Sequence, residues 1–166
     1  LFKHLGEDTP TEERQQLAAL FDSFRDESVP EIWQEAWPDW CFDMSLKAKK
    51  GNAIAPFFRN DLTANRELMH VLVRVLNWEG SSMIRFASCM ICGDSKRLEI
   101  LRPRIETALR EITYEQIQSI EDLGLSEKPR QALIHGPLHL ENSFGVLDLG
   151  LLYGPVSLSQ TDIRAA

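Results

Sequence analysis

Hydrophobic residues recur every three or four positions through most of residues 10–112, which is the spacing of one face of an α-helix. The first helix is predicted where Thr9-Pro-Thr-Glu12 supplies a capping threonine, a proline at the first helical position and a glutamate three residues after the cap. Pro38 should kink or split the second helix, because proline lacks the backbone N–H that a helix interior uses. The predicted helices of this part cover about residues 10–26, 29–50 and 62–78.

Two further helices are predicted on either side of Gly93. Residues 83–91 are apolar without alternation, which favours a helix over a strand, and Gly93 ends that helix. Asp94 and Ser95 are both good N-caps for the helix that follows, and Pro103 should bend or restart it. The pattern predicts a helix-turn-helix, which places the start of its second helix in the major groove of DNA. The alternative is an ordinary helix corner with a solvated basic face.

The pattern changes after Pro129. Residues 131–141 and 144–150 predict two strands around a short turn at Asn142-Ser143, with the first strand broken at Gly136-Pro137. This hairpin would serve as the wing of the helix-turn-helix.

The chain as a whole is predicted to be mainly α, of the α+β class. A helical bundle over residues 1–78 would precede a winged-helix-like module over residues 79–166 that ends in the β-hairpin. Hydrophobic residues make up 43% and charged residues 26%, the composition of a folded globular protein. No apolar run approaches the roughly 18–20 residues that cross a bilayer, and three cysteines do not make a disulfide framework. We therefore expect a cytoplasmic protein without a membrane partner.

Charge is distributed unevenly along the chain. The net charge is −7, and residues 7–39 hold ten Asp and Glu against two arginines. Residues 83–104 hold instead five basic residues against Asp94 and Glu99. A polyanion would therefore meet the middle of the chain. The residues expected to contact DNA are Arg85, Ser95, Lys96, Arg97, Arg102 and Arg104.

Three tryptophans, Trp33, Trp37 and Trp40, share one stripe of the second predicted helix. Packing in the core or between lobes is the first interpretation, because large aromatic rings dominate buried area. Binding of a ligand or a partner subunit by this stripe, together with the acidic helices around it, is the second.

The pairs Cys89-x-x-Cys92 and His135-x-x-x-His139 have the local spacings of a two-Cys, two-His zinc site. However, 42 residues separate Cys92 from His135, against about a dozen in a compact zinc finger. Redox catalysis is disfavoured as well, because the cysteines lie at the end of a predicted helix, where the dipole does not favour a thiolate. The sequence has no nucleophile elbow and no glycine-rich phosphate loop. We therefore predict no catalytic residue and no cofactor, with a zinc-binding enzyme fragment as a remote alternative.

The run from Ile84 to Glu99, with Gly93-Asp-Ser-Lys-Arg-Leu-Glu99 as its most specific part, carries a family resemblance. Together with residues 123–130 and 134–140, it resembles the region that precedes the TOPRIM domain in the nuclease subunit of Wadjet-type bacterial plasmid-defence systems and related bacterial proteins. The resemblance covers roughly residues 79–160. The family is similar in architecture to the DNA-cleaving subunit of type IIB topoisomerases, in which a winged helix precedes the TOPRIM domain.

The resemblance implies a non-catalytic portion of a nuclease subunit that engages or positions DNA. The family's catalytic domain would then lie beyond Ala166, and the chain, which begins at Leu1 rather than Met, would be a piece of a longer protein. Glu141 is expected to be a strand residue, because no Asp-x-Asp follows it as the TOPRIM metal site requires. The implied partners are double-stranded DNA and other subunits of a defence complex. A homodimer is a further possibility that the sequence does not decide. The alternative function is a protein-interaction module that docks a partner subunit through the acidic tryptophan-rich helices, without nucleic-acid binding.

Overall fold

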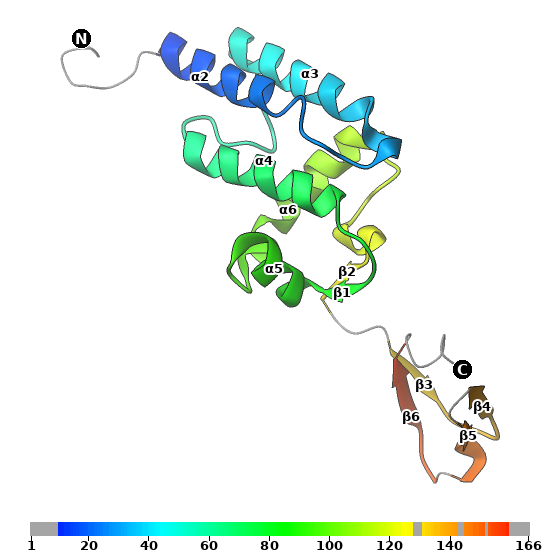
Figure 1. Ribbon diagram of the computed structural model, residues 1–166. Helices are drawn as coiled ribbons and strands as arrows, with labels where there is room; N and C mark the ends of the chain where they lie inside the picture. Colours follow the sequence, from blue (N-terminus) through cyan, green and yellow to red (C-terminus); the bar gives the residue numbers. More distant parts are fainter. Residues whose placement is uncertain (1–9, 128–130, 143–144, 152, 160–166) are drawn as a thin grey trace. The chain divides into compact units, whose positions relative to one another are not determined.

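The computed structural model describes residues 10–127, 131–142, 145–151 and 153–159. Figure 1 shows a mainly α chain with few, short strands, as the hydrophobic pattern predicts. The chain divides after Leu125 into two compact units. The boundary expected near residue 78 does not coincide with this division, because the helices on both sides of residue 78 share one core.

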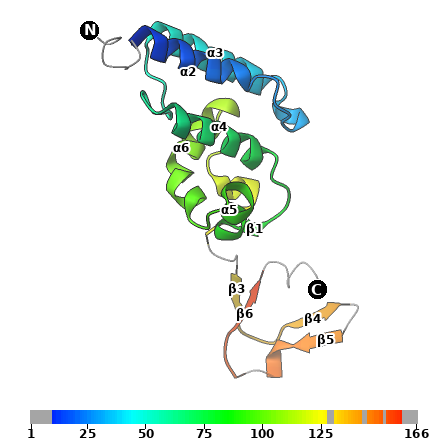
Figure 2. The ribbon, with the colours of Figure 1, turned by 60° about the vertical axis from the view of Figure 1, so that its left-hand side comes forward.

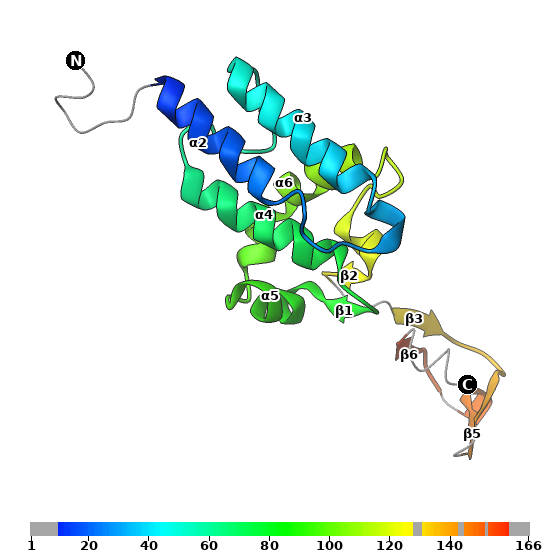
Figure 3. The ribbon, with the colours of Figure 1, turned by 45° about the horizontal axis from the view of Figure 1, so that its top comes forward.

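The first unit begins with two helices that lie side by side in Figure 1 and Figure 3. Pro38 neither kinks nor breaks the second of these helices, because it lies in the first helical turn, where no N–H is needed. The predicted segment is instead interrupted before Ala36, where a short 3-10 turn precedes the helix. The elements of this part are α2 (Pro10–Ser23), η1 (Glu31–Trp33), α3 (Ala36–Lys50) and α4 (Leu62–Leu76).

The rest of the first unit follows α4 in the order strand, helix, helix, 3-10 turn, strand. Helix α6 continues through Pro103 rather than restarting there. Figure 2 shows α2 and α3 at one end of the unit, α4 and α6 next to them, and α5 beyond. The two short strands pair with each other. These elements are β1 (Ser82–Met83), α5 (Ile84–Cys92), α6 (Arg97–Ile112), η2 (Ile120–Leu123) and β2 (Leu125–Ser126).

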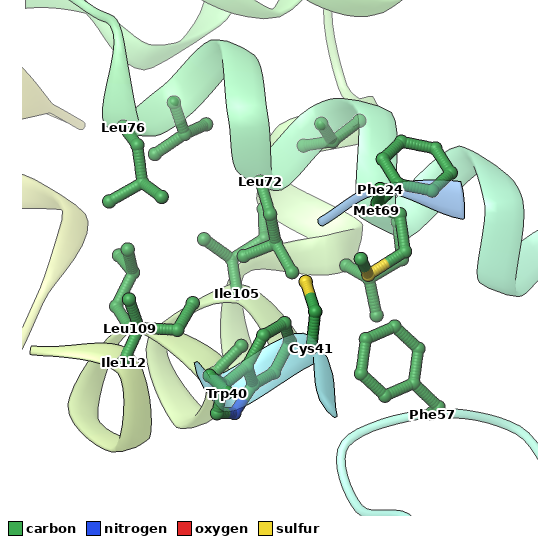
Figure 4. Packing of buried hydrophobic residues seen from close by; sticks show 14 of the residues in the cluster. Phe24, Trp40, Cys41, Phe57, Met69, Leu72, Leu76, Ile105, Leu109 and Ile112 are labelled. Carbon is green, nitrogen blue, oxygen red and sulfur yellow. The ribbon is translucent and has the colours of Figure 1, made fainter. Parts of the chain in front are cut away.

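The core of the first unit is built by α2, α3, α4 and α6. In Figure 4, Trp40 of α3 lies close to Leu72 of α4 and Leu109 of α6. Trp33, Trp37 and Trp40 are only 6%, 0% and 7% exposed, so the packing interpretation of the stripe is the one that the structure shows. The predicted role of these rings in partner binding needs correction, because buried rings offer a partner almost no surface.

Two of the three indole N–H groups of the stripe donate hydrogen bonds inside the protein. Trp37 Nε1 donates to the carbonyl oxygen of Phe24 at 2.8 Å, and Trp40 Nε1 donates to Glu111 Oε2 at 3.0 Å. These hydrogen bonds fix the rings in the core, because an unpaired buried N–H is costly.

The second unit contains two antiparallel strand pairs. Strand β4 (His139–Asn142) pairs with β5 (Gly145–Asp148), which confirms the predicted hairpin. Asn142 of the predicted Asn142-Ser143 turn belongs to β4, and residue 143 lies outside the described residues. Strand β3 (Gln131–Ile134) pairs instead with β6 (Val156–Ser159), a partner that the pattern did not indicate. A 3-10 turn, η3 (Leu149–Leu151), follows β5.

Among the described residues, no helix has the length and apolar character needed to span a lipid bilayer.

Candidate nucleic-acid interface

Helices α5 and α6 occupy the segment for which the helix-turn-helix was predicted, with a short turn between them. Gly93 ends α5 in the left-handed conformation, with φ at 73°, and its N–H donates to the carbonyl oxygen of Cys89 at 3.0 Å. The turn then closes through Asp94 Oδ1, which accepts from the backbone N–H of Lys96 at 2.7 Å.

The cap of α6 comes from α5 and not from the turn. Ser88 is buried, and its hydroxyl accepts from the backbone N–H of Leu98 at 3.0 Å and donates to the carbonyl oxygen of Asp94. Lys96 occupies the N-cap position without a side-chain hydrogen bond there, and Ser95 is exposed. The expectation that Asp94 or Ser95 would cap the helix is therefore corrected: a serine ten residues before Leu98 supplies the oxygen, because the helix corner folds it back onto α6.

Two of the residues predicted to contact DNA, Lys96 and Arg97, lie at the start of α6, and only Arg97 forms an ion pair within the described part of the protein. Lys96 is exposed, and its ammonium group forms no ion pair with any described residue. Arg97 forms a bidentate pair with Glu67 of α4, with Nε–Oε1 at 2.7 Å and Nη2–Oε2 at 2.6 Å. Hydrogen bonding from Arg97 lowers the pKa of Glu67, and the same contact raises the pKa of Arg97. Both groups are therefore charged at neutral pH.

The other three predicted arginines are engaged in contacts within the first unit. Arg85 Nε donates to Glu99 Oε1 at 2.9 Å, which joins α5 to α6.

Arg102 and Arg104 lie further along α6 and contact other residues of the first unit. Arg102 donates to Glu106 at 2.8 Å and to the hydroxyl of Ser119 at 3.2 Å, next to η2. Arg104 lies over the ring of Phe58, 3.6 Å from its centroid, and donates to the carbonyl oxygen of Pro56. Of the predicted set, Lys96 and Arg97 thus keep a place at the start of α6, whereas Arg102 and Arg104 stabilise the fold around it.

A groove between α4 and the end of α5 contains basic residues that the sequence analysis missed. Arg66, His70 and Arg74 are exposed and lie four residues apart on α4, so they share one face. The groove has a volume of about 530 Å³. Its lining residues are Thr63, Arg66, Glu67, His70, Val71, Arg74, Ile91 and Cys92. The four-residue spacing of three basic side chains was the signal in the sequence.

The cysteines of the predicted zinc alternative lie on α5, and the histidines lie in the second unit. Cys89 is exposed, whereas burial raises the pKa of the half-buried Cys92 thiol. His139 Nδ1 lies 3.7 Å from Asp148 Oδ2. Within the described ranges, no group of three or more His, Cys, Asp or Glu side chains is placed to hold a metal ion.

Comparisons with protein-family models, curated proteins and solved structures found no match to this chain.

Proposed function

We propose that the chain binds double-stranded DNA through the helix-turn-helix of α5 and α6, as a non-catalytic part of a larger plasmid-defence nuclease subunit in the cytoplasm. The observation that carries the proposal is the basic start of α6, with Lys96 exposed and Arg97 half-buried, directly after the glycine turn that ends α5. The order of α4, β1, α5, α6 and β2, with β1 paired to β2, supports a winged-helix-like module. In such units the start of the second helix faces the major groove.

The ion pair of Arg97 with Glu67 is compatible with DNA binding. Its two side chains are 34% and 37% exposed. Exposed ion pairs contribute only about 0.2–1 kcal/mol, so a DNA phosphate can replace the carboxylate as the partner of Arg97. Lys96 needs no such exchange, because it forms no ion pair with the described residues.

The test is duplex binding by the full chain, measured by fluorescence anisotropy over a range of salt concentrations. Each phosphate contact adds about 0.9 to the slope of log affinity against log salt. Lys96→Ala/Arg97→Ala should therefore reduce that slope by about 1.8 and weaken binding at low salt. The control is Lys49→Ala/Lys50→Ala, which removes two adjacent exposed lysines from the end of α3. Absence of binding at low salt, or an equal loss in the control, would overturn the proposal.

A second candidate is docking of a partner subunit without nucleic acid. Burial of the tryptophans argues against the stripe as the docking surface, but three apolar side chains of α5 and its approach are exposed. Met83, Phe86 and Met90 recur at helical spacing and are 37%, 62% and 63% exposed. Phe86→Ser separates the candidates, because it disrupts an apolar interface without changing any charge. It should leave duplex affinity nearly unchanged if DNA binding is the function, and should reduce self-association in sedimentation experiments if the surface pairs two copies.

A further inference from the structure

The groove along α4 contains positively charged side chains that are not paired with carboxylates of the described residues. Arg66 forms no ion pair with any described residue, and the lining carboxylate of Glu67 is already paired with Arg97. Arg74 donates to the carbonyl oxygen of Ile91 at 2.7 Å, so its charge meets no carboxylate. The groove is therefore an electropositive surface on a chain whose net charge is −7.

Two basic side chains of the groove, His70 and Arg74, are held in position. The ring of His70 packs edge-to-face on Phe24, with centroids 4.8 Å apart. Arg74 spans from α4 to the last turn of α5 through its hydrogen bond to Ile91. An ordered arrangement of this kind loses less side-chain entropy when an anion binds.

The spacing of the groove residues suits an extended polyanion. Arg66 and Arg74 are eight residues apart, which corresponds to about 12 Å along the helix axis. One strand of DNA presents a phosphate about every 3.4 Å of its axis, so the row corresponds to about three to four phosphate spacings along that axis. The basic residues are exposed along their row, whereas small-molecule sites usually enclose most of the ligand.

The groove is also continuous with the helix-turn-helix. Glu67 in its lining is bonded to Arg97 at the start of α6, and Ile91 and Cys92 in the opposite wall end α5. We propose that the α4 groove binds the phosphate backbone of one strand of the same duplex whose major groove receives α6. This inference rests on the proposed function and assigns to α4 a positioning role that carries no sequence information.

The experiment compares Arg66→Ala with Arg66→Lys in the full chain, using two duplexes of unrelated sequence. Loss of one phosphate contact should lower the salt slope by about 0.9, equivalent to about eightfold in affinity across a tenfold range of salt. The loss should be the same for both duplexes, and Arg66→Lys should restore the slope. Lys50→Ala, which removes an exposed lysine from α3, is the matched control.

The outcomes separate the two proposals. An unchanged slope for Arg66→Ala, alongside a reduced slope for Lys96→Ala/Arg97→Ala, overturns the groove and leaves the helix-turn-helix standing. The reverse result supports the groove and overturns the role of the helix-turn-helix, and absence of duplex binding by the unmodified chain overturns both. The last measurement is a titration of the full chain with inorganic phosphate, monitored by the NMR signals of His70. Saturation at micromolar concentrations would identify a site for a small anion and overturn the backbone assignment.

Discussion

Ser88 should stabilise the corner between α5 and α6 more than Asp94 or Ser95, the two residues that the sequence predicted as the cap of α6. Ser88→Ala removes the oxygen that accepts from the Leu98 N–H at 3.0 Å and donates to the carbonyl oxygen of Asp94. Ser88 and Leu98 are both 0% exposed, so water cannot take the place of the hydroxyl.

The expected cost follows from that geometry. Loss of an N-cap hydroxyl costs about 0.5–2 kcal/mol, and a buried donor left without a partner costs about 1–3 kcal/mol. Both ranges describe the same hydrogen bond to Leu98 and are not added. We expect Ser88→Ala to lower the free energy of unfolding by about 2 kcal/mol. At roughly 3–5 °C per kcal/mol for a unit of this size, Tm should fall by roughly 6–10 °C.

The assay is thermal and urea unfolding followed by far-ultraviolet circular dichroism. Its helical signal reports on the first unit, because the α-helices among the described residues all lie there. Ser95→Ala is the matched control: Ser95 is exposed and its hydroxyl bonds to no described residue, so its loss should cost less than about 0.5 kcal/mol. The reasoning is refuted if Ser88→Ala unfolds like the unmodified chain, or if Ser95→Ala is equally destabilised.

Three further predictions concern side chains of the first unit. Glu67→Gln should free Arg97 and raise duplex affinity about two- to fivefold, as expected for loss of an exposed ion pair; unchanged or weaker binding would contradict this. Because Arg97 lowers the pKa of Glu67 from 4.5, the pair stabilises the fold above about pH 4.5 and loses that contribution as the pH falls further. The stability difference between the unmodified chain and Glu67→Gln should therefore shrink in acid, as thermal unfolding at several pH values would show. Iodoacetamide should label Cys89 first, Cys92 more slowly, and Cys41 only after unfolding, because burial raises the pKa of Cys41 to about 12. Peptide mass spectrometry measures that order, and equal rates for Cys89 and Cys92 would contradict it.

The sequence predicts best where the signal is local. Gly93 ends α5 as expected, since only its neighbours in the chain decide whether a left-handed residue is needed there. The β4–β5 hairpin was likewise indicated by residues within one short segment. The prediction for Pro38 was wrong because the helix begins at Ala36, only two residues before the proline. A proline in the first turn, where it is tolerated, cannot be told from the sequence alone from one that breaks a helix interior.

The sequence predicts poorly where residues from different elements meet. The cap from Ser88, the pairing of β3 with β6 and the ion pair of Arg97 with Glu67 all depend on how the chain packs. The partners of the arginines predicted to contact DNA could not be predicted for the same reason. Arg102 and Arg104 belong to the same basic stretch of sequence as Arg97, yet they contact η2 and the segment around Pro56.

The packing of helix α6 decides which fragments of this protein can be expressed alone or exchanged between proteins. This helix packs on both α3 and α4, and Trp40 of α3 donates to Glu111 near the end of α6. A fragment that began at residue 79 would retain the whole helix-turn-helix but expose Ile105 and Leu109, which are 0% exposed in the intact unit. The exchangeable cassette for grafting or recombination is therefore the whole first unit together with the rest of β2, and not a segment that begins at residue 79.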